Sequence, residues 1–190
     1  YLKKTTPAKI ATTLSHLKTL HLIIERNLEQ AIIFEDDVKV PLDFPSKLGF
    51  VLSEVPNDYD YVYLWTHPKY VHRDDTMFLI PGKTHIRHYS YTYTNTAYLV
   101  SLAGAKKIVK YFSRSLYDYT DFMINDMNSS GKLTTYMSRT NLVENLGQLT
   151  SITAGEILKS NIHPPQSVQS KMKHFIHRVV RRSFKVFREV

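Results

Sequence analysis

Three consecutive carboxylates, Glu35, Asp36 and Asp37, directly follow the apolar run Ile32-Ile33-Phe34. Such a short apolar run is typical of a buried strand, and ligands of open α/β sheets bind at the carboxyl ends of these strands. In extended backbone Glu35 and Asp37 share one face, while Asp36 points to the other. Carboxylate oxygens on one face suit a hard divalent cation, Mg²⁺ or Mn²⁺. The alternative is a solvated acidic turn without a metal, which is common for short motifs.

A second acidic group lies in the expected helix at 117–128. Asp118 and Asp121 are three residues apart, so they share a helix face near its N-terminus. One interpretation is compensation of the helix dipole, which contributes about 0.3–1 kcal/mol for each acidic residue. The other is a general base beside a bound ligand. The spacing leaves both interpretations open.

The composition limits the class of protein. The chain has 190 residues, enough for one domain with an appendage, and 43% of them are hydrophobic. It has no cysteine, which excludes disulfides and thiolate chemistry. No segment approaches the roughly 20 apolar residues of a membrane span. Walker, G-x-G-x-x-G and G-x-S-x-G motifs are absent from the sequence, so nothing supports those nucleotide-binding or hydrolase classes.

The formal net charge of +8 is concentrated at the end of the chain. Residues 171–190 hold seven Lys or Arg residues against Glu189 alone, and the body is near neutral. A nucleic-acid-binding body would carry its own basic face, so no nucleic-acid partner is expected. An apolar stripe runs through the same segment and predicts an amphipathic helix on an anionic membrane surface: Met172, Phe175, Ile176, Val179, Val180, Phe184, Phe187 and Val190. The alternatives are a solvated tail or a helix packed on the body.

The pattern along the chain predicts alternating helices and strands. Helices are expected from Pro7 to about Asn27 and at 45–55, 102–111 and 117–128, with Ser101 as a cap of the third. Strands are expected at 31–35, 60–65, 85–100 and 133–137. This order indicates an α/β domain at 1–163, with a mostly parallel sheet flanked by helices. Residues 164–190 are expected to form a basic amphipathic tail.

Several segments, in this order, resemble glycosyltransferase family 25. The resemblance spans roughly residues 5–155 and rests on these stretches: Thr6-Pro7-Ala8-Lys9-Ile10, Leu14-Ser15-His16-Leu17, Ile32-Ile33-Phe34-Glu35-Asp36-Asp37-Val38, Asn95-Thr96-Ala97-Tyr98-Leu99-Val100-Ser101, Gly104-Ala105-Lys106-Lys107, and Leu142-Val143-Glu144 with Ser151-Ile152. Bacterial members build lipooligosaccharide, many as β-1,4-galactosyltransferases, and relatives include procollagen galactosyltransferases. Members normally begin with a strand in a βαβ unit. Nothing similar precedes Tyr1, so we expect that an N-terminal part is missing.

The resemblance implies a GT-A-like, Rossmann-like fold and transfer of a hexose, galactose in many members, from a UDP-sugar to a lipid-linked oligosaccharide. The metal would bind Asp37 with Glu35. Asp121 would be the catalytic base; the prolines usual before this position are missing here, so Asp118 is the alternative. The residues expected near the donor are Ser15, His16, Glu35, Asp36, Thr96 and Tyr98.

The same resemblance implies a cytoplasmic enzyme, peripheral on the inner face of the bacterial inner membrane. Two alternatives stay open. His16 can be a structural histidine, and the whole chain can be a non-catalytic membrane- or polyanion-binding module that retains the fold.

Overall fold

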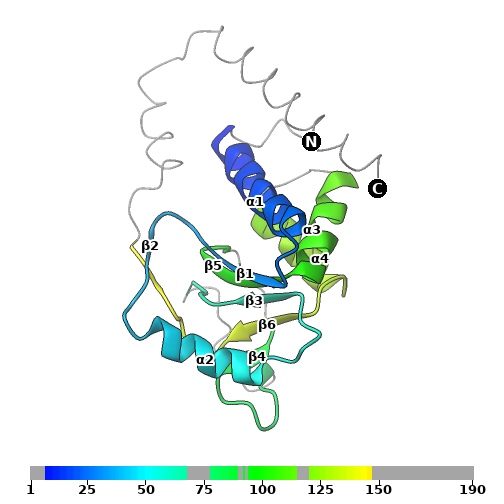
Figure 1. Cartoon of the computed structure of the whole chain (residues 1–190). Coiled ribbons are helices and arrows are strands. Elements are labelled where there is room, and N and C mark those ends of the chain that lie inside the picture. Colours follow the sequence, from blue (N-terminus) through cyan, green and yellow to red (C-terminus); the bar gives the residue numbers. More distant parts are fainter. Residues whose placement is uncertain (1–6, 68–77, 90–91, 93, 115–119, 147–190) are drawn as a thin grey trace, which may run out of the picture. The chain divides into compact units, whose positions relative to one another are not determined.

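The computed structural model describes residues 7–67, 78–89, 92, 94–114 and 120–146 (Figure 1). Its helices are α1 (Pro7–Glu25), α2 (Phe44–Glu54), α3 (Leu102–Arg114) and α4 (Thr120–Ser129). Its strands are β1 (Gln30–Phe34), β2 (Val38–Lys39), β3 (Tyr61–Tyr63), β4 (Ile86–His88), β5 (Ala97–Ser101), β6 (Thr135–Ser138) and β7 (Glu144–Asn145). The expected tail at 164–190 lies outside the described residues. Among those described, no helix combines the length and apolar character that a membrane crossing requires.

Helices cover both faces of a five-stranded sheet whose order is β1-β5-β3-β6-β4 (Figure 1). On one face, Ile33, Tyr61 and Tyr98 pack with α1, α3 and α4. On the other, Val62 and Leu99 pack with α2 and with residues next to β7. Alternate side chains of a strand point to opposite faces, so the apolar runs in β1, β3 and β5 fill both cores. The α/β class is therefore confirmed.

The expectation of a mostly parallel sheet is wrong. In the described sheet β3 pairs in parallel with β6, whereas β1–β5, β3–β5 and β4–β6 are antiparallel. A continuous apolar run reports burial on both faces, which this mixed sheet provides without parallel pairing. The run alone therefore did not determine strand direction.

The single strand expected at 85–100 is also wrong. The segment forms two strands far apart in the sheet, because β4 lies at an edge beside β6 and β5 lies between β1 and β3. Before β5, the Thr94 hydroxyl accepts a hydrogen bond from the Thr96 backbone N–H at 3.2 Å. Such side-chain bonds compete with a strand ladder. The alternation of tyrosine and threonine concealed this break.

The ends of two helices follow their sequence signals. After α1, Asn27 adopts a positive φ of 50°. The N–H of Leu28 bonds to the carbonyl of Ile23 at 3.0 Å, and the N–H of Asn27 bonds to Ile24 at 3.1 Å. These two bonds form a Schellman motif. At the start of α3, Ser101 caps the helix by accepting the Gly104 N–H at 3.0 Å.

Glycine at position 104 lets α3 lie directly against the start of β3. A Cβ atom built there would stand 2.1 Å from the carbonyl oxygen of Asp60, a backbone atom that cannot turn away. The buried Asp60 side chain accepts bonds from the Thr134 N–H at 2.8 Å and from Lys107 Nζ at 2.5 Å. Asp60 therefore ties β3, α3 and the segment before β6 together.

Candidate active site

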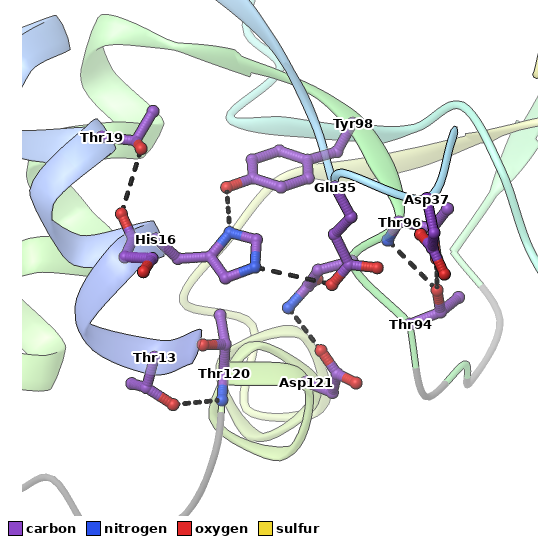
Figure 2. A network of polar contacts seen from close by, with 12 residues as sticks. Thr13, His16, Thr19, Glu35, Asp37, Thr94, Thr96, Tyr98, Thr120 and Asp121 are labelled. Carbon is purple, nitrogen blue, oxygen red and sulfur yellow. Dashed lines mark hydrogen bonds and ion pairs between the residues drawn. The ribbon is translucent and has the colours of Figure 1, made fainter. Parts of the chain in front are cut away.

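Four elements bring polar side chains to one place beside the end of β1. His16 comes from α1, Glu35 follows β1, Tyr98 lies on β5 and Asp121 lies in the first turn of α4 (Figure 2). A hydrogen bond joins two of these elements, α1 and α4, directly. The N–H of Thr120 donates to the Thr13 hydroxyl at 3.2 Å, which holds the start of α4 against α1. Residues more than 100 positions apart thus face one another.

His16 connects Tyr98 to Glu35. Its ring is 7% exposed, its Nδ1 lies 2.9 Å from the Tyr98 hydroxyl, and its Nε2 lies 3.7 Å from Glu35 Oε1 (Figure 2). A carboxylate in front of Nε2 favours the tautomer with the proton there, and Nδ1 then accepts from the Tyr98 hydroxyl. This arrangement places the Glu35 carboxylate and the His16 Nε2–H next to each other.

Asp121 is a carboxylate held in an unfavourable environment. Burial raises its pKa to about 7; the negative charge of Glu35 adds to the rise and His16 opposes it. Compensation of the helix dipole alone would instead favour the ionised form and lower the pKa. Burial therefore outweighs the dipole, and Asp121 can exchange a proton near neutral pH.

Asn95 and Tyr61 complete the cluster. Asn95 Nδ2 donates to Asp121 Oδ1 at 2.6 Å, and the Tyr61 hydroxyl donates to Asn95 Oδ1 at 2.8 Å. The ring of Tyr61 stacks on Tyr98, with centroids 4.6 Å apart. Neither residue was among the predicted site residues. In the sequence, Asn95 is a polar residue within a strand-like run. That pattern does not indicate which distant residues its side chain contacts.

The carboxylate of Asp37 has one feature expected of a metal ligand. Among the described residues its Oδ1 atom is buried without a hydrogen-bond partner, while Oδ2 accepts a long bond of 3.4 Å from Asn145. Desolvation raises the pKa of Asp37, with further contributions from Glu35 and Asp36. A buried oxygen without a donor fits a ligand of a hard cation.

The rest of the expected ligand set is less complete. Glu35 faces His16, and in the part of the chain that the structure describes no three acidic, histidine or cysteine residues gather around one point. Mg²⁺ commonly takes only one or two protein carboxylates, with substrate phosphates and water as its other ligands. The residues present therefore fit a cation completed by a substrate, with Asp37 as its protein ligand.

The other predicted site residues differ in how far they are exposed. Thr96 is buried and bonds Thr94 through its hydroxyl at 2.8 Å, and its carbonyl accepts the Glu35 N–H at 2.9 Å. Asp36 is exposed. Ser15 is also exposed, and its hydroxyl donates to the Ala11 carbonyl within α1 at 3.0 Å. Asp118 lies outside the described residues.

Comparison with known proteins connects this geometry to one family. The family model described as "Glycosyltransferase family 25 (LPS biosynthesis protein)" matches residues 2–124. Procollagen galactosyltransferase 1-A of Xenopus laevis is 32% identical over 107 residues, which are 55% of this chain and 17% of that protein. A Bos taurus protein named "Probable inactive glycosyltransferase 25 family member 3" is 31% identical over 107 residues, 55% of this chain and 18% of that protein. The chain thus spans less than a fifth of the length of these curated relatives.

Proposed function

The chain belongs to glycosyltransferase family 25, and from this premise we propose that it transfers a hexose, galactose, from a UDP-sugar to a hydroxyl group of a glycan acceptor. The names of several similar proteins, procollagen galactosyltransferases, support galactose as the sugar. The mixed sheet with helices on both faces supports a GT-A-like assignment, which forms part of the proposal.

Asp121 carries this proposal. A general base works best when its pKa lies near the operating pH, and burial raises the pKa of Asp121 to about 7. In the proposed reaction Asp121 removes the proton from the acceptor hydroxyl as that oxygen attacks the anomeric carbon. The bond from the sugar to UDP breaks, and UDP leaves with the bonding electrons.

The other residues of the cluster would bind the donor. Glu35 and the His16 Nε2–H present an acceptor and a donor side by side, which suits the hydroxyl groups of a sugar. Asp37 would hold Mn²⁺ or Mg²⁺ through its buried carboxylate oxygen. When bound, such a cation would supply positive charge that offsets the negative charge developing on the leaving group.

Turnover assays test the proposal. Full-length protein with Mn²⁺ should hydrolyse or transfer from UDP-galactose, with UDP-glucose as the comparison donor. Asp121→Asn keeps the shape of the side chain and should lower turnover about 10²–10⁴-fold while UDP-sugar affinity stays near the wild-type value. Unchanged turnover in that variant, with a loss in Asp118→Asn, would move the base to Asp118.

We further propose that the acceptor is lipid-linked and that residues 171–190 hold the enzyme on the cytoplasmic face of an anionic bacterial membrane. The description of the family as LPS biosynthesis proteins and the seven cations of this segment support the idea. Each cation near such a surface contributes on the order of 1 kcal/mol, weakened by salt. Deleting 171–190 should release the protein from anionic vesicles in low-salt cosedimentation. Equal pelleting of both chains would contradict the anchor.

A second candidate is a non-catalytic module that retains the fold. It is motivated by the Bos taurus relative named "Probable inactive glycosyltransferase 25 family member 3". The two functions separate in one assay, because a module should show no UDP-sugar turnover in Mn²⁺ with either donor. The raised pKa of Asp121 favours the enzyme, since a purely structural carboxylate gains nothing from it.

A further inference from the structure

Asn95 joins the base to the buried aromatic core. Its side chain is 1% exposed and makes one hydrogen bond at each end, from Nδ2 to Asp121 and from the Tyr61 hydroxyl to Oδ1. We propose that Asn95 is a positioning residue that fixes the Asp121 carboxylate for proton abstraction, and that Tyr61 sets the orientation of its amide. The proposal rests on the proposed transferase function, which it deepens.

The chemistry of Asp121 and Tyr61 determines which end of the Asn95 amide faces each of them. An ionised carboxylate only accepts hydrogen bonds, so Asp121 requires the NH₂ group of Asn95. The amide oxygen then points to Tyr61, whose hydroxyl can donate. Tyr61 is itself 1% exposed and stacked on Tyr98, so its hydroxyl has little freedom to move. The fixed Tyr61 hydroxyl thus orients the Asn95 amide, and the amide in turn orients the Asp121 carboxylate.

The hydrogen bond from Asn95 engages one carboxylate oxygen of Asp121, Oδ1, and leaves Oδ2 for the substrate. Among the described residues, Asn95 alone donates a hydrogen bond to the Asp121 side chain, and it bonds Oδ1 at 2.6 Å. Oδ2 is then the atom that can accept the proton of an acceptor hydroxyl. Because Tyr98 also bonds His16, the same aromatic pair holds both the base and the expected donor side. A small displacement of Asn95 would therefore misalign the base without altering Glu35 or His16.

Two substitutions at Asn95 separate positioning from simple structural support. Asn95→Asp retains the shape but replaces the NH₂ donor by an oxygen that repels Asp121; Asn95→Ala removes the shape as well. A structural role predicts the larger defect for Asn95→Ala. The positioning role predicts that Asn95→Asp lowers kcat at least as much as Asn95→Ala, each about 10–100-fold, with the KM for UDP-galactose unchanged. Wild-type kcat in Asn95→Asp would overturn the inference.

Two tyrosines of β3 supply a matched pair. Tyr61→Phe deletes only the hydroxyl that orients Asn95, and kcat should fall about 3–10-fold, the effect of one lost hydrogen bond. Tyr63→Phe deletes a hydroxyl from a side chain equally buried on the same strand, but without a bond to Asn95. Its kcat should stay within about twofold of wild type. Equal losses in both variants would show a general effect on the core and overturn the role of Tyr61.

A measurement without turnover distinguishes failure of this inference from failure of the proposed function. Carboxyl ¹³C NMR can follow the titration of Asp121, with Asp121→Asn identifying its resonance. Glu35 and His16 also face this carboxylate, so both are kept in every variant. The midpoint should rise in Asn95→Ala and rise further in Asn95→Asp, while Tyr63→Phe leaves it unchanged. Unaltered titration in both Asn95 variants would overturn the inference even if the wild type is active. Lack of wild-type turnover together with the expected titration shifts would overturn the proposed function and leave only the effect of Asn95 on the Asp121 carboxylate.

Discussion

Two pairs of carboxylates in this domain differ in how well the surrounding structure satisfies them. Glu54, at the end of α2, accepts the backbone N–H groups of Thr84 and His85 at 3.0 and 2.7 Å. Asp60 accepts from Thr134 and Lys107. In the candidate site, by contrast, the described residues give a buried oxygen of Asp37 no partner, and they give Asp121 one donor and a negative neighbour.

The pKa values of Glu54 and Asp121 express this difference. Although desolvation acts to raise it, hydrogen bonds from the backbone of Thr84 and His85 lower the pKa of Glu54 to about 2. Burial raises that of Asp121 to about 7. Glu54 and Asp60 therefore join separate segments of chain, whereas Asp37 and Asp121 remain unfavourable until a ligand or a proton binds. Carboxylates left in such an environment mark sites of function.

The comparison first predicts a large loss of stability for Asp60→Ala. The substitution leaves the Thr134 N–H without its acceptor and Lys107 without its partner, and should cost about 3 kcal/mol of unfolding free energy. Urea denaturation at pH 7 measures it. Lys39→Ala is the control, because its bond to Glu144 is exposed and should contribute less than about 1 kcal/mol. Similar losses of stability in the two variants would show that Asp60 does not hold these segments together.

The opposite sign is expected for Asp121→Asn. The pKa of Asp121 is about 7 in the fold against 3.8 for an unperturbed aspartate, so ionisation destabilises the folded state as the pH rises between these values. Removing the charge should therefore raise the unfolding free energy at pH 8 by about 1–3 kcal/mol, with no gain at pH 3.5. Denaturation of both proteins at the two pH values checks this. Destabilisation at pH 8 would mean that the carboxylate is satisfied after all.

Asp37→Asn should weaken the binding of nucleotide in Mn²⁺ while leaving the metal-free protein intact. Loss of one charged ligand should lower UDP affinity about tenfold or more by calorimetry. Stability without metal should rise slightly, since the raised pKa of Asp37 indicates a cost of ionisation. The exposed Asp36→Asn serves as the control. Equal affinity in all three proteins would contradict a metal role for Asp37.

The smallest effect is expected for Glu54→Gln. The variant keeps one acceptor for the N–H groups of Thr84 and His85, and the site is near solvent, so the loss should stay below about 1 kcal/mol at pH 7. Because the pKa of Glu54 is lowered to about 2, its contribution is present above pH 4.5 and disappears as the pH falls through 2. The difference between wild type and variant should therefore vanish in acid. A difference that persists at pH 2 would assign the loss to packing.

The sequence predicted what depends on local pattern. The strand before Glu35, the end of α1 at Asn27 and the cap at Ser101 each rest on a few neighbouring residues, and all three are confirmed. The expected burial of that strand is confirmed only in part, because β1 lies at an edge of the sheet and Phe34 is 38% exposed. The predicted parallel direction of most strands was wrong, because an apolar run looks the same in parallel and antiparallel pairs. Asn95 and Tyr61 were missed as site residues, because their contacts join positions at least 26 residues apart. Family resemblance, rather than spacing, pointed to His16.

The most direct measurement of the central claim, that burial prepares Asp121 to act as the catalytic base, is the pH dependence of the transfer rate. Single-turnover reactions with saturating UDP-galactose and Mn²⁺ should be followed from pH 5 to 9 in wild type and Asp121→Asn. The base must be deprotonated to work, so the wild-type rate should rise with pH through a midpoint near 7. The residual rate of Asp121→Asn should lack that rise. A wild-type rate that is already maximal at pH 5, or a variant that retains the same midpoint, would contradict the claim.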